Sequence, residues 1–281
     1  MRVHHLNCGC MCPLGGALFD GFSRGLTARL VCHCLLIETD TDGLVLVDTG
    51  FGTTDVARPE ARLSTFFRYF NNIRFEHRYT ALEQVRQLGF DPQDVRHIVL
   101  THLDFDHAGG LEDFPNARVH VMQTEMDAAR SAAGWRDTRR FREKQWNGVT
   151  DWAFYQPQGE RWNGFDAVRT LIGANSHDIL LVPLAGHTPG HAGVAVRTGD
   201  GWLLHAGDAY FYRGEIGNHR RECTPGLRFY QRMMEYDHKQ RVDNQNRLRE
   251  LSLATDQQVR MFCSHDALEL ERAQAANPRR L

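Results

Sequence analysis

The sequence predicts a layered α/β fold, and three observations lead to this prediction. Strand-like runs fall into two groups along the chain with helix-like segments between them, which is typical of layered α/β domains. Several of these runs end next to a histidine or an aspartate and are followed by a loop. The 281 residues contain no internal repeat, low-complexity tract or linker rich in proline and serine. We therefore expect a single domain over residues 1–281, long enough to bury a sizeable core.

Charge and composition exclude several classes of function. The formal net charge is −2, with 33 basic and 35 acidic residues, and the arginines are scattered, so nucleic acid is not an expected partner. The first residues, MRVHHLNCGCMCPLGG, lack the apolar run of a signal peptide, and no segment is apolar for long enough to span a membrane. An odd number of cysteines, 7, favours reduced thiols. We expect a cytoplasmic chain with no membrane partner.

The first group of strands lies in the N-terminal half. Ala28–Glu38 is rich in β-forming residues and, with Gly43–Gly50 after the turn TDTDG, predicts a hairpin. The apolar spacing in Ala81–Phe90 predicts a helix that ends at a glycine. A short apolar strand, His97–His102, then ends on its histidine. Downstream we expect a strand over Ala117–Met122 and a helix over Thr124–Gly134.

The second group lies in the C-terminal half. Ile179–His187 and Gly201–Asp208 are predicted strands that each end on a candidate ligand, with a hairpin over Ala192–Trp202 between them. Residues 226–255 are predicted to be helical in two pieces, and a last strand over Gln258–Asp266 carries a late histidine. Side chains on loops at strand ends converge at one edge of a sheet, where small-molecule sites form.

One short motif has the spacing of a metal site. In HLDFDH, imidazoles and carboxylates stand at the first, third, fifth and sixth positions, and together they suit divalent transition ions. The adjacent final pair requires a sharp loop, which Gly109 and Gly110 permit. The hexapeptide alone could be a solvated polar loop. Against this, GHTPGH, HAGDA and SHD each follow a predicted strand and offer another histidine or aspartate.

These motifs resemble those of the metallo-beta-lactamase superfamily. THLDFDHAGG, GHTPGH, the GD at 207–208 and His265 are similar to its pattern His-x-His-x-Asp-His followed by a distant His, Asp and His. VLVDTGFG resembles a further motif whose aspartate, here Asp48, supports the metal site. The resemblance runs from Asp48 to His265 and implies an αββα sandwich, two mixed sheets flanked by helices, with the site at one edge between the sheets. It is specific for fold and metal use but not for substrate.

The resemblance also implies a set of ligands for two divalent metal ions. Zinc is the preferred metal, with manganese and iron as alternatives. Carried over position by position, the first ion would be held by His102, Asp104 and His187, the second by Asp106, His107 and His265, and both by a bridging Asp208.

Asp104 departs from the common pattern, which has a histidine there. It could bind the first ion directly, which would make that site harder and favour manganese or iron. Because aspartate is shorter than histidine, it could instead reach the ion only through water or a moved backbone. It could also contact a ligand rather than the ion, which would leave the first site weak or empty. Flavodiiron proteins of this superfamily carry a glutamate at this position and hold two irons, but they also have a flavin domain.

The implied reaction is hydrolysis, in which a hydroxide shared by two ions attacks the carbonyl of a lactone or another ester. Asp104 in place of histidine should lower the charge of the centre and make that hydroxide more basic. Asp106 or Asp208 could shuttle the proton to the leaving group. Lactonases of this superfamily have a tyrosine where this chain has Phe211, so Tyr212 is a further candidate. Alternatives are a thioester hydrolase, an iron-dependent oxidoreductase and a non-catalytic relative that binds a ligand.

Two segments rich in aromatic residues, at about 130–176 and 210–250, are expected insertions that shape the pocket. Such aromatics belong to packed loops more often than to substrate contacts. Their number nevertheless favours a small organic substrate with an apolar or aromatic part. A homo-oligomer is left open.

Other conspicuous residues are expected to be structural. The group of His4, His5, Cys8, Cys10 and Cys12 has spacing unlike that of a zinc site and predicts an N-terminal strand. Cys32 and Cys34 share one strand face and are expected in the core. His191 and His205 should support loops through hydrogen bonds. Arg136–Lys144 is expected to be a solvated helical face.

Overall fold

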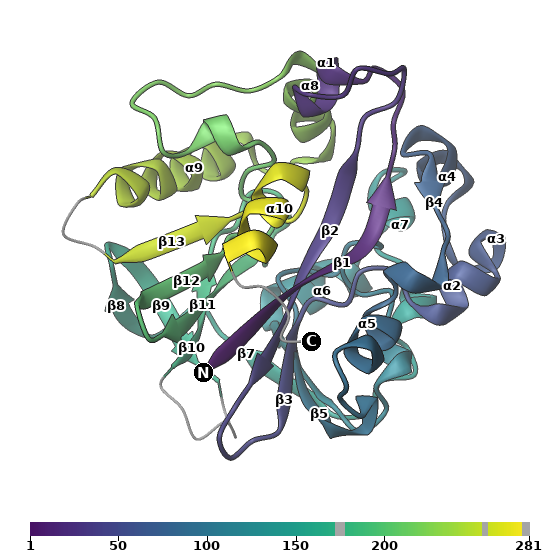
Figure 1. Cartoon of the computed structure of the whole chain (residues 1–281), viewed down its shortest axis with the longest axis vertical. Coiled ribbons are helices and arrows are strands. Elements are labelled where there is room, and N and C mark those ends of the chain that lie inside the picture. Colours follow the sequence, from purple (N-terminus) through teal and green to yellow (C-terminus); the bar gives the residue numbers. More distant parts are fainter. Residues whose placement is uncertain (172–177, 255–257, 277–281) are drawn as a thin grey trace.

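Two β-sheets that pack face to face form the centre of the protein in the computed structural model, which describes residues 1–171, 178–254 and 258–276 (Figure 1). The first sheet has the order β4-β1-β2-β3-β5-β6-β7 and the second β13-β12-β11-β10-β9-β8. The first contains β1 (Arg2–Met11), β2 (Leu30–Glu38), β3 (Leu44–Val47), β4 (Ile73–Arg74), β5 (Val95–Val99), β6 (Arg118–Met122) and β7 (Trp152–Tyr155). The second contains β8 (Glu160–Trp162), β9 (Phe165–Thr170), β10 (Ile179–Pro183), β11 (Ala192–Thr198), β12 (Gly201–His205) and β13 (Val259–Phe262).

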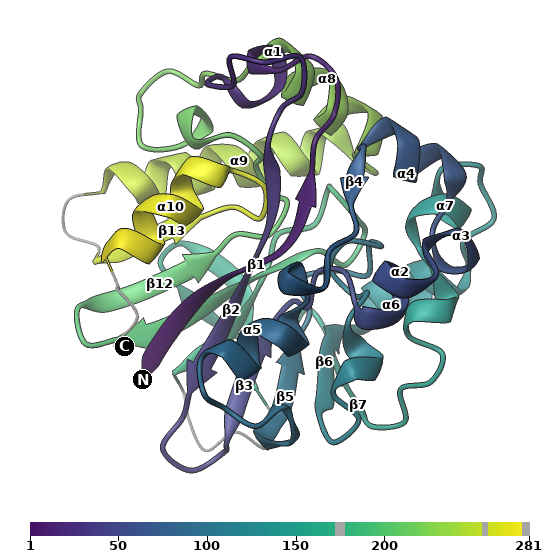
Figure 2. The same cartoon turned by 45° about the vertical axis from the view of Figure 1, so that its right-hand side comes forward.

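Helices lie on the outer side of each sheet, so that the layers are helix, sheet, sheet and helix (Figure 2). The helices are α1 (Ala17–Asp20), α2 (Thr53–Ala57), α3 (Pro59–Arg62), α4 (Thr65–Phe70), α5 (Ala81–Gln87), α6 (Gln123–Arg130), α7 (Asp137–Arg140), α8 (Pro225–Met234), α9 (His238–Leu253) and α10 (Ala267–Ala276). Both sheets are mixed, since β1–β2–β3 and β10–β11–β12 are antiparallel while β3–β5–β6 and β12–β13 are parallel. The predicted sandwich of two mixed sheets is confirmed.

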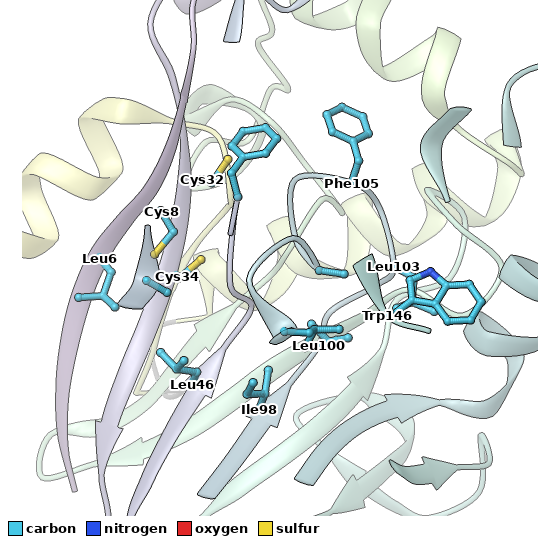
Figure 3. Packing of buried hydrophobic residues seen from close by; sticks show 14 of the residues in the cluster. Leu6, Cys8, Cys32, Cys34, Leu46, Ile98, Leu100, Leu103, Phe105 and Trp146 are labelled. Atoms are coloured by element: carbon cyan, nitrogen blue, oxygen red, sulfur yellow. The ribbon is translucent and has the colours of Figure 1, made fainter. Parts of the chain in front are cut away.

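Alternation along β2 separates two hydrophobic cores, because successive side chains of a strand point to opposite faces. Leu35 and Ile37 pack between the sheets against residues of β10 and β11. Cys34 and Leu36 face the other way and join the cluster beneath α5 and α6, part of which Figure 3 shows. A third cluster lies between the second sheet and α9. The prediction that Cys32 and Cys34 belong to the core is confirmed.

The predicted hairpin is confirmed, with Leu35 opposite Val47 in β2 and β3. The hairpin of β11 and β12 and the two helical pieces α8 and α9 are confirmed as well. The prediction that strands run up to the ligands is wrong, because β5, β10, β12 and β13 all end several residues earlier. A pleated strand turns neighbouring side chains to opposite faces, so ligands that meet at one point need loops. The strands β7, β8 and β9 within 130–176 were not predicted, and residues 172–176 lie outside the described part.

Membrane insertion by a helix finds no support in the described part of the chain, since none of its helices combines the length and the apolar character that crossing requires.

Candidate metal centre

The ends of five strands meet at one edge of the sandwich. Since β10 and β12 are both antiparallel to β11, and β13 is parallel to β12, these three strands finish at the same edge. His187, Asp208 and His265 lie on the loops that follow them. In the first sheet β3 and β5 are parallel, so Asp48 after β3 lies beside the 102–107 loop after β5. The topology therefore brings all predicted ligands to one place.

The 102–107 loop is a tight turn. The backbone N–H groups of His107 and Ala108 both donate to the carbonyl of Asp104, over 3.0 and 3.2 Å. The turn continues into Gly109, where an added Cβ would lie 2.2 Å from Asp55 Oδ2 and 2.6 Å from the carbonyl oxygen of Gly50. Only glycine fits this position, so the glycines of the motif serve close packing of the loop.

His102, Asp104 and His187 form what we call the first half of the site. The Oδ2 atom of Asp104 lies 3.3 Å from His102 Nε2 and 3.0 Å from His187 Nε2. The donor atoms of all three residues lie within 4.8 Å of one another. Ligand atoms around a tetrahedral ion with bonds of about 2.1 Å are about 3.4 Å apart. The spacing of the first half therefore fits one ion.

Arg140 closes the first half from the side of α7. Its Nε and Nη2 groups donate to the two carboxylate oxygens of Asp104 over 2.6 and 2.5 Å, and Nη2 also donates to His187 Nε2 over 3.0 Å. The expectation of a solvated face over Arg136–Lys144 is wrong for this residue, whose side chain is only 1% exposed. The reason is local: α7 ends at Arg140, and the next residue, Phe141, pairs with the backbone of Asp104.

This contact determines the charge of Asp104. Burial alone would raise the pKa of its carboxyl group, but Arg140, followed by His102, holds that pKa well below the ordinary value. Asp104 is therefore ionised at neutral pH and paired with a cation in two parallel hydrogen bonds, the strongest arrangement for a carboxylate. The pair as a whole carries no net charge.

Asp106, His107 and His265 form the second half. His265 Nε2 lies 3.6 Å from Asp106 Oδ2, and His107 Nε2 lies 4.0 Å from Asp106 Oδ1. The thiol of Cys32 joins this half, because its sulfur and one donor atom each of Asp106 and His265 lie within 4.8 Å of one another. The sequence did not indicate that Cys32 would lie next to candidate ligands.

Asp208 lies between the two halves. Its Oδ1 is 3.5 Å from His107 Nε2, while its Oδ2 is 3.1 Å from His265 Nε2 and 3.3 Å from His187 Nε2. One carboxylate therefore contacts histidines of both halves, which is the position that a bridging ligand requires.

Hydrogen bonds at the far side of three imidazole rings fix which nitrogen faces the site. His107 Nδ1 donates to Asp48 Oδ2 over 2.8 Å, and His265 Nδ1 donates to a backbone carbonyl of β2 over 2.7 Å. The Thr101 hydroxyl donates its proton to Asp48 and so accepts from His102 Nδ1, over 2.7 and 2.9 Å. Each ring thus carries a proton on Nδ1 and offers the Nε2 lone pair to the site, the usual arrangement of metal-binding histidines.

Several atoms that face the site have no partner. The Nε2 atoms of His102 and His107 and the Oδ1 atom of Asp208 are buried without a hydrogen bond to any described residue. An unpaired buried polar atom costs about 1–3 kcal/mol. A divalent cation would satisfy all three atoms, and the residues present therefore fit a metal centre.

The charges of the second half favour a further positive charge. Burial lowers the pKa of His107, but Asp208, followed by Asp48 and Asp106, raises it well above the ordinary value. Burial raises the pKa of Asp106. The second half thus attracts a cation at His107 Nε2, either a proton or a metal ion.

The aromatic residues after Asp208 take up different positions. Phe211, at the position of the lactonase tyrosine, is 1% exposed, and its ring centre lies 5.7 Å from that of His187 and 5.0 Å from that of His265. Tyr212 lines a small cavity next to His265, and its hydroxyl accepts a hydrogen bond from Arg213 over 3.2 Å.

Tyr230 on α8 was not singled out in the sequence. Its ring centre lies 5.8 Å from that of Phe211, and its hydroxyl accepts a hydrogen bond from Asn71 over 3.4 Å. Burial, followed by the charge of Asp106, raises the pKa of Tyr230 well above the ordinary value. A tyrosine in an amphipathic helix gives no local sequence signal that it will lie near candidate ligands.

The two supporting histidines behave as expected. The backbone N–H of Asp208 donates to His191 Nε2 over 2.9 Å, and His191 Nδ1 donates to the carbonyl of Leu184 over 3.0 Å. His205 Nδ1 accepts a hydrogen bond from the backbone N–H of Gly207 over 3.1 Å, and its Nε2 donates to the carbonyl of His33 over 2.6 Å. Both histidines therefore position loops, as predicted.

Glu125 is a second support that the sequence did not reveal. Its fully buried carboxylate accepts from the backbone N–H of Leu103 over 2.9 Å and from that of Gly190 over 3.0 Å. It therefore ties the loop of His102 to the loop of His187.

Comparison with known proteins identifies relatives over most of the chain. The family model described as the metallo-beta-lactamase superfamily matches residues 27–253. Probable metallo-hydrolases of Mycobacterium bovis and Mycobacterium tuberculosis are each 42% identical over 266 residues, which cover 95% of this chain and 80% of theirs. An N-acyl homoserine lactonase of Bacillus thuringiensis is 32% identical over 123 residues, 42% of this chain and 49% of that protein.

Solved structures share the architecture. An N-acyl homoserine lactone hydrolase with N-hexanoyl-L-homoserine bound at its catalytic metal centre superposes with a TM-score of 0.70 at 20% identity, over 96% of this chain and 95% of that one. A dizinc quorum-quenching lactonase superposes with a TM-score of 0.62 at 18% identity, over 94% and 86% of the two chains. At these identities the likeness shows the fold.

Proposed function

We propose that this chain, which belongs to the metallo-beta-lactamase superfamily and is a metal-dependent hydrolase, holds two divalent metal ions and hydrolyses a lactone or another ester. One observation carries the proposal. Seven side chains with metal-binding groups, none more than 5% exposed, converge from the loops after β5, β10, β12 and β13, and three of their donor atoms lack a partner among the described residues.

Each half would hold one ion. The ligands we propose are His102, Asp104 and His187 for the first, Asp106, His107 and His265 for the second, and Asp208 for both. When bound, such ions make water a nucleophile near neutral pH and polarise a carbonyl oxygen. We take zinc as the preferred metal, and the carboxylate of Asp104 leaves manganese and iron as alternatives.

Arg140 changes the consequence of an aspartate at position 104. The aspartate by itself would lower the net charge of the centre, but the paired guanidinium restores the charge that a neutral histidine would give. Arg140 Nη2 also donates to His187 Nε2, the atom that an ion in the first half would need. We therefore propose that the first half binds its ion more weakly than the second.

A row of aromatic rings in contact, which extends from the surface to the candidate ligands, supports a substrate with an apolar part. Trp135, which is 56% exposed, meets Phe66 edge to face with 5.1 Å between ring centres. Phe66 stacks on Phe70 at 5.5 Å, and Phe70 stacks on Tyr230 at 5.9 Å. Tyr230 then contacts Phe211 beside the ligands. These rings offer an apolar surface that extends to the ligands, and N-acyl homoserine lactones, named for the lactonase relatives, are the first substrates to test.

Protonation of the leaving alkoxide has four candidates in this chain. Asp106 and Asp208 lie at the site itself, while Tyr212 lines the adjacent cavity. Tyr230 is the fourth, because its hydroxyl lies within the field of the carboxylates. The variants Tyr212→Phe and Tyr230→Phe distinguish the two tyrosines. The variant that removes the proton donor should lose about 100-fold in kcat/KM, and the other variant should change little.

A second candidate function is iron-dependent oxidation or reduction, which the carboxylate of Asp104 favours through its preference for harder ions. Metal analysis of protein purified without added metal, combined with assays on lactones, esters and thioesters, separates the two. Two equivalents of zinc or manganese with lactone turnover would support the hydrolase. Iron with redox activity and no ester hydrolysis would support the oxidoreductase, and protein that binds no metal would contradict both.

A further inference from the structure

Cys32 adds a sulfur donor to the site, a type of donor that the common ligand pattern does not include. It belongs to β2 and is 2% exposed. Its sulfur and one donor atom each of Asp106 and His265 lie within 4.8 Å of one another. Thiolate sulfur is a strong ligand for soft and borderline ions such as zinc, cobalt and cadmium. Its position next to two candidate ligands therefore raises the question of whether it binds the second ion.

Residues on β1 and β2 hold the Cys32 thiol in this position. Val31, the neighbour of Cys32, accepts a hydrogen bond from His265 Nδ1 over 2.7 Å, so the same strand that carries the thiol orients the imidazole. Gly9 on the adjacent β1 leaves room for the sulfur, since a Cβ at that position would lie 2.6 Å from Cys32 Sγ and 2.7 Å from Phe51. A larger residue at position 9 would push the sulfur from this place.

Cys34 provides an internal comparison. It lies two residues farther along β2, points to the same face and is as deeply buried as Cys32. Burial, followed by the thiol of Cys8, raises the pKa of the Cys34 thiol well above the ordinary value. Figure 3 shows the sulfurs of Cys8 and Cys34 close together and the sulfur of Cys32 apart from them, and the sulfur of Cys32 is the one grouped with Asp106 and His265. Of these three thiols, Cys32 is therefore the one directed at the site.

A separate observation concerns two buried polar atoms on this side of the site. His107 Nε2 and Asp208 Oδ1 are 3.5 Å apart, and neither has a hydrogen bond to a described residue. Their side chains are 2% and 4% exposed, so water offers little compensation. Asp106 also supplies one of the two donor atoms that lie within 4.8 Å of the Cys32 sulfur. Asp106 and His265, whose donor atoms group with the thiol, lie 4.0 Å from His107 Nε2 and 3.1 Å from Asp208 Oδ2, so they connect the thiol with the two residues that carry the unpaired atoms.

We infer that Cys32 is a further ligand of the second metal ion, bound as a thiolate together with Asp106, His107 and His265. The inference rests on the proposed metal centre. On binding, the sulfur–metal bond forms and the S–H bond breaks, and the proton passes to water, so no oxidant or reductant is needed. The second half then combines nitrogen, oxygen and sulfur donors and prefers zinc, cobalt or cadmium to manganese, whereas the first half has no sulfur donor to give it this preference.

Cobalt substitution tests this ligand by a readout other than activity. The metal-free full-length chain is loaded with Co²⁺, the bound cobalt is counted, and the near-ultraviolet spectrum is recorded. A thiolate on cobalt gives a charge-transfer absorption that nitrogen and oxygen donors do not. We expect this band in the natural chain and in Cys34→Ser, and its loss in Cys32→Ser. Cys32→Ala with a circular dichroism spectrum serves as a second variant in case the serine disturbs the fold.

Metal preference gives the second measurement. Cys32→Ser should lose at least about 10-fold in Cd²⁺ affinity at the tighter site and change little in Mn²⁺ affinity, because only the soft ion depends on sulfur. Cobalt bound without the band, or a band that persists in Cys32→Ser, would overturn the role of Cys32 and leave the metal centre intact. A chain that binds no cobalt at all would instead overturn the metal centre and this inference with it.

Discussion

The two halves of the site have the same number of histidines and aspartates but balance their charges differently. The first half contains Asp104 with a buried arginine on both of its carboxylate oxygens. The second half contains Asp106, which no arginine contacts among the interactions seen in the described residues. In the same half, His107 Nε2 and Oδ1 of the bridging Asp208 have no hydrogen bond to a described residue. The carboxylate of the first half is therefore neutralised by an arginine of the chain itself, whereas no arginine neutralises that of the second among the interactions of the described residues.

This difference shows that a ligand substitution has to be judged together with its neighbours. An aspartate in place of a histidine changes the net charge only if nothing compensates it, and Arg140 does so here. The same arginine competes with an ion for His187 Nε2. We expect the second half to fill first when a divalent metal is added to the metal-free protein.

Removal of Arg140 should have the largest effect. Arg140→Met leaves the carboxylate of Asp104 buried without its partner, which should lower the free energy of unfolding of the metal-free protein by about 3–5 kcal/mol. A divalent ion should recover much of this loss, because it can take the place of the guanidinium. Urea unfolding of chelator-treated protein, with and without added zinc, measures both effects.

Arg139→Met is the matched control, since Arg139 lies on the same helix and packs over the ring of Trp135. We expect a change within about 0.5 kcal/mol, as for most surface positions. Similar losses in both variants would show that Arg140 has no special role in the first half.

The second prediction concerns a return to the common ligand pattern. Asp104→His installs the usual histidine but leaves Arg140 buried without an anion, so the variant should bind less metal in its first half. The double variant Asp104→His with Arg140→Met should regain that metal, and the two changes should couple by about 2 kcal/mol. Metal counting and a double-mutant cycle of unfolding free energies test this, and strictly additive effects would contradict it.

The ligand-type residues could be predicted because their signal is local. HLDFDH places four candidate groups within six positions, and each remaining candidate directly follows a recognisable strand. The sandwich followed from the same alternation of strands and helices. The strands of the 130–176 segment were not predicted, because β7 pairs with β6 only through tertiary contact and β8 is short and exposed.

Arg140 and Cys32 could not be assigned from sequence for physical reasons. Arg140 stands in RDTRRFREK, where nothing local separates it from Arg139, and its partner Asp104 lies 36 positions away. The alternation of β2 correctly placed Cys32 in the core. That the start of β2 lies at the site depends on its antiparallel register with β3, which pairs Leu35 with Val47.

The third prediction uses Asp48, which supports the halves unequally. It accepts directly from His107 of the second half but reaches His102 of the first only through the Thr101 hydroxyl. Asp48→Asn should weaken metal binding by about 10–100-fold, with the larger loss at the second half. Asparagine tolerates the φ of 56° at this position, so the backbone should keep its course. Chelator competition measures both affinities, and equal losses would contradict the assignment.

The last comparison is the opposite effect of pH on the stability that Asp106 and Asp104 contribute to the metal-free protein. The change at Asp106 is the smallest that we expect. Burial raises the pKa of Asp106, so this group contributes stability that is present below the ordinary aspartate pKa of about 4 and is lost as the pH rises through its folded value. For Asp104, despite burial, Arg140 lowers the pKa, so its contribution is present above about pH 4 and is lost as the pH falls.

Asp106→Asn should therefore stabilise the chelator-treated protein at pH 7 by about 1 kcal/mol, because it removes a buried carboxylate that, in the described part of the chain, no arginine neutralises. The gain should vanish near pH 4, where the natural side chain is protonated. Asp104→Asn should act in the opposite direction at pH 7, since it strips Arg140 of its anion. Unfolding free energies measured from pH 4 to pH 8 compare the two, and a loss of stability at pH 7 in both variants would mean that the halves do not differ in charge balance.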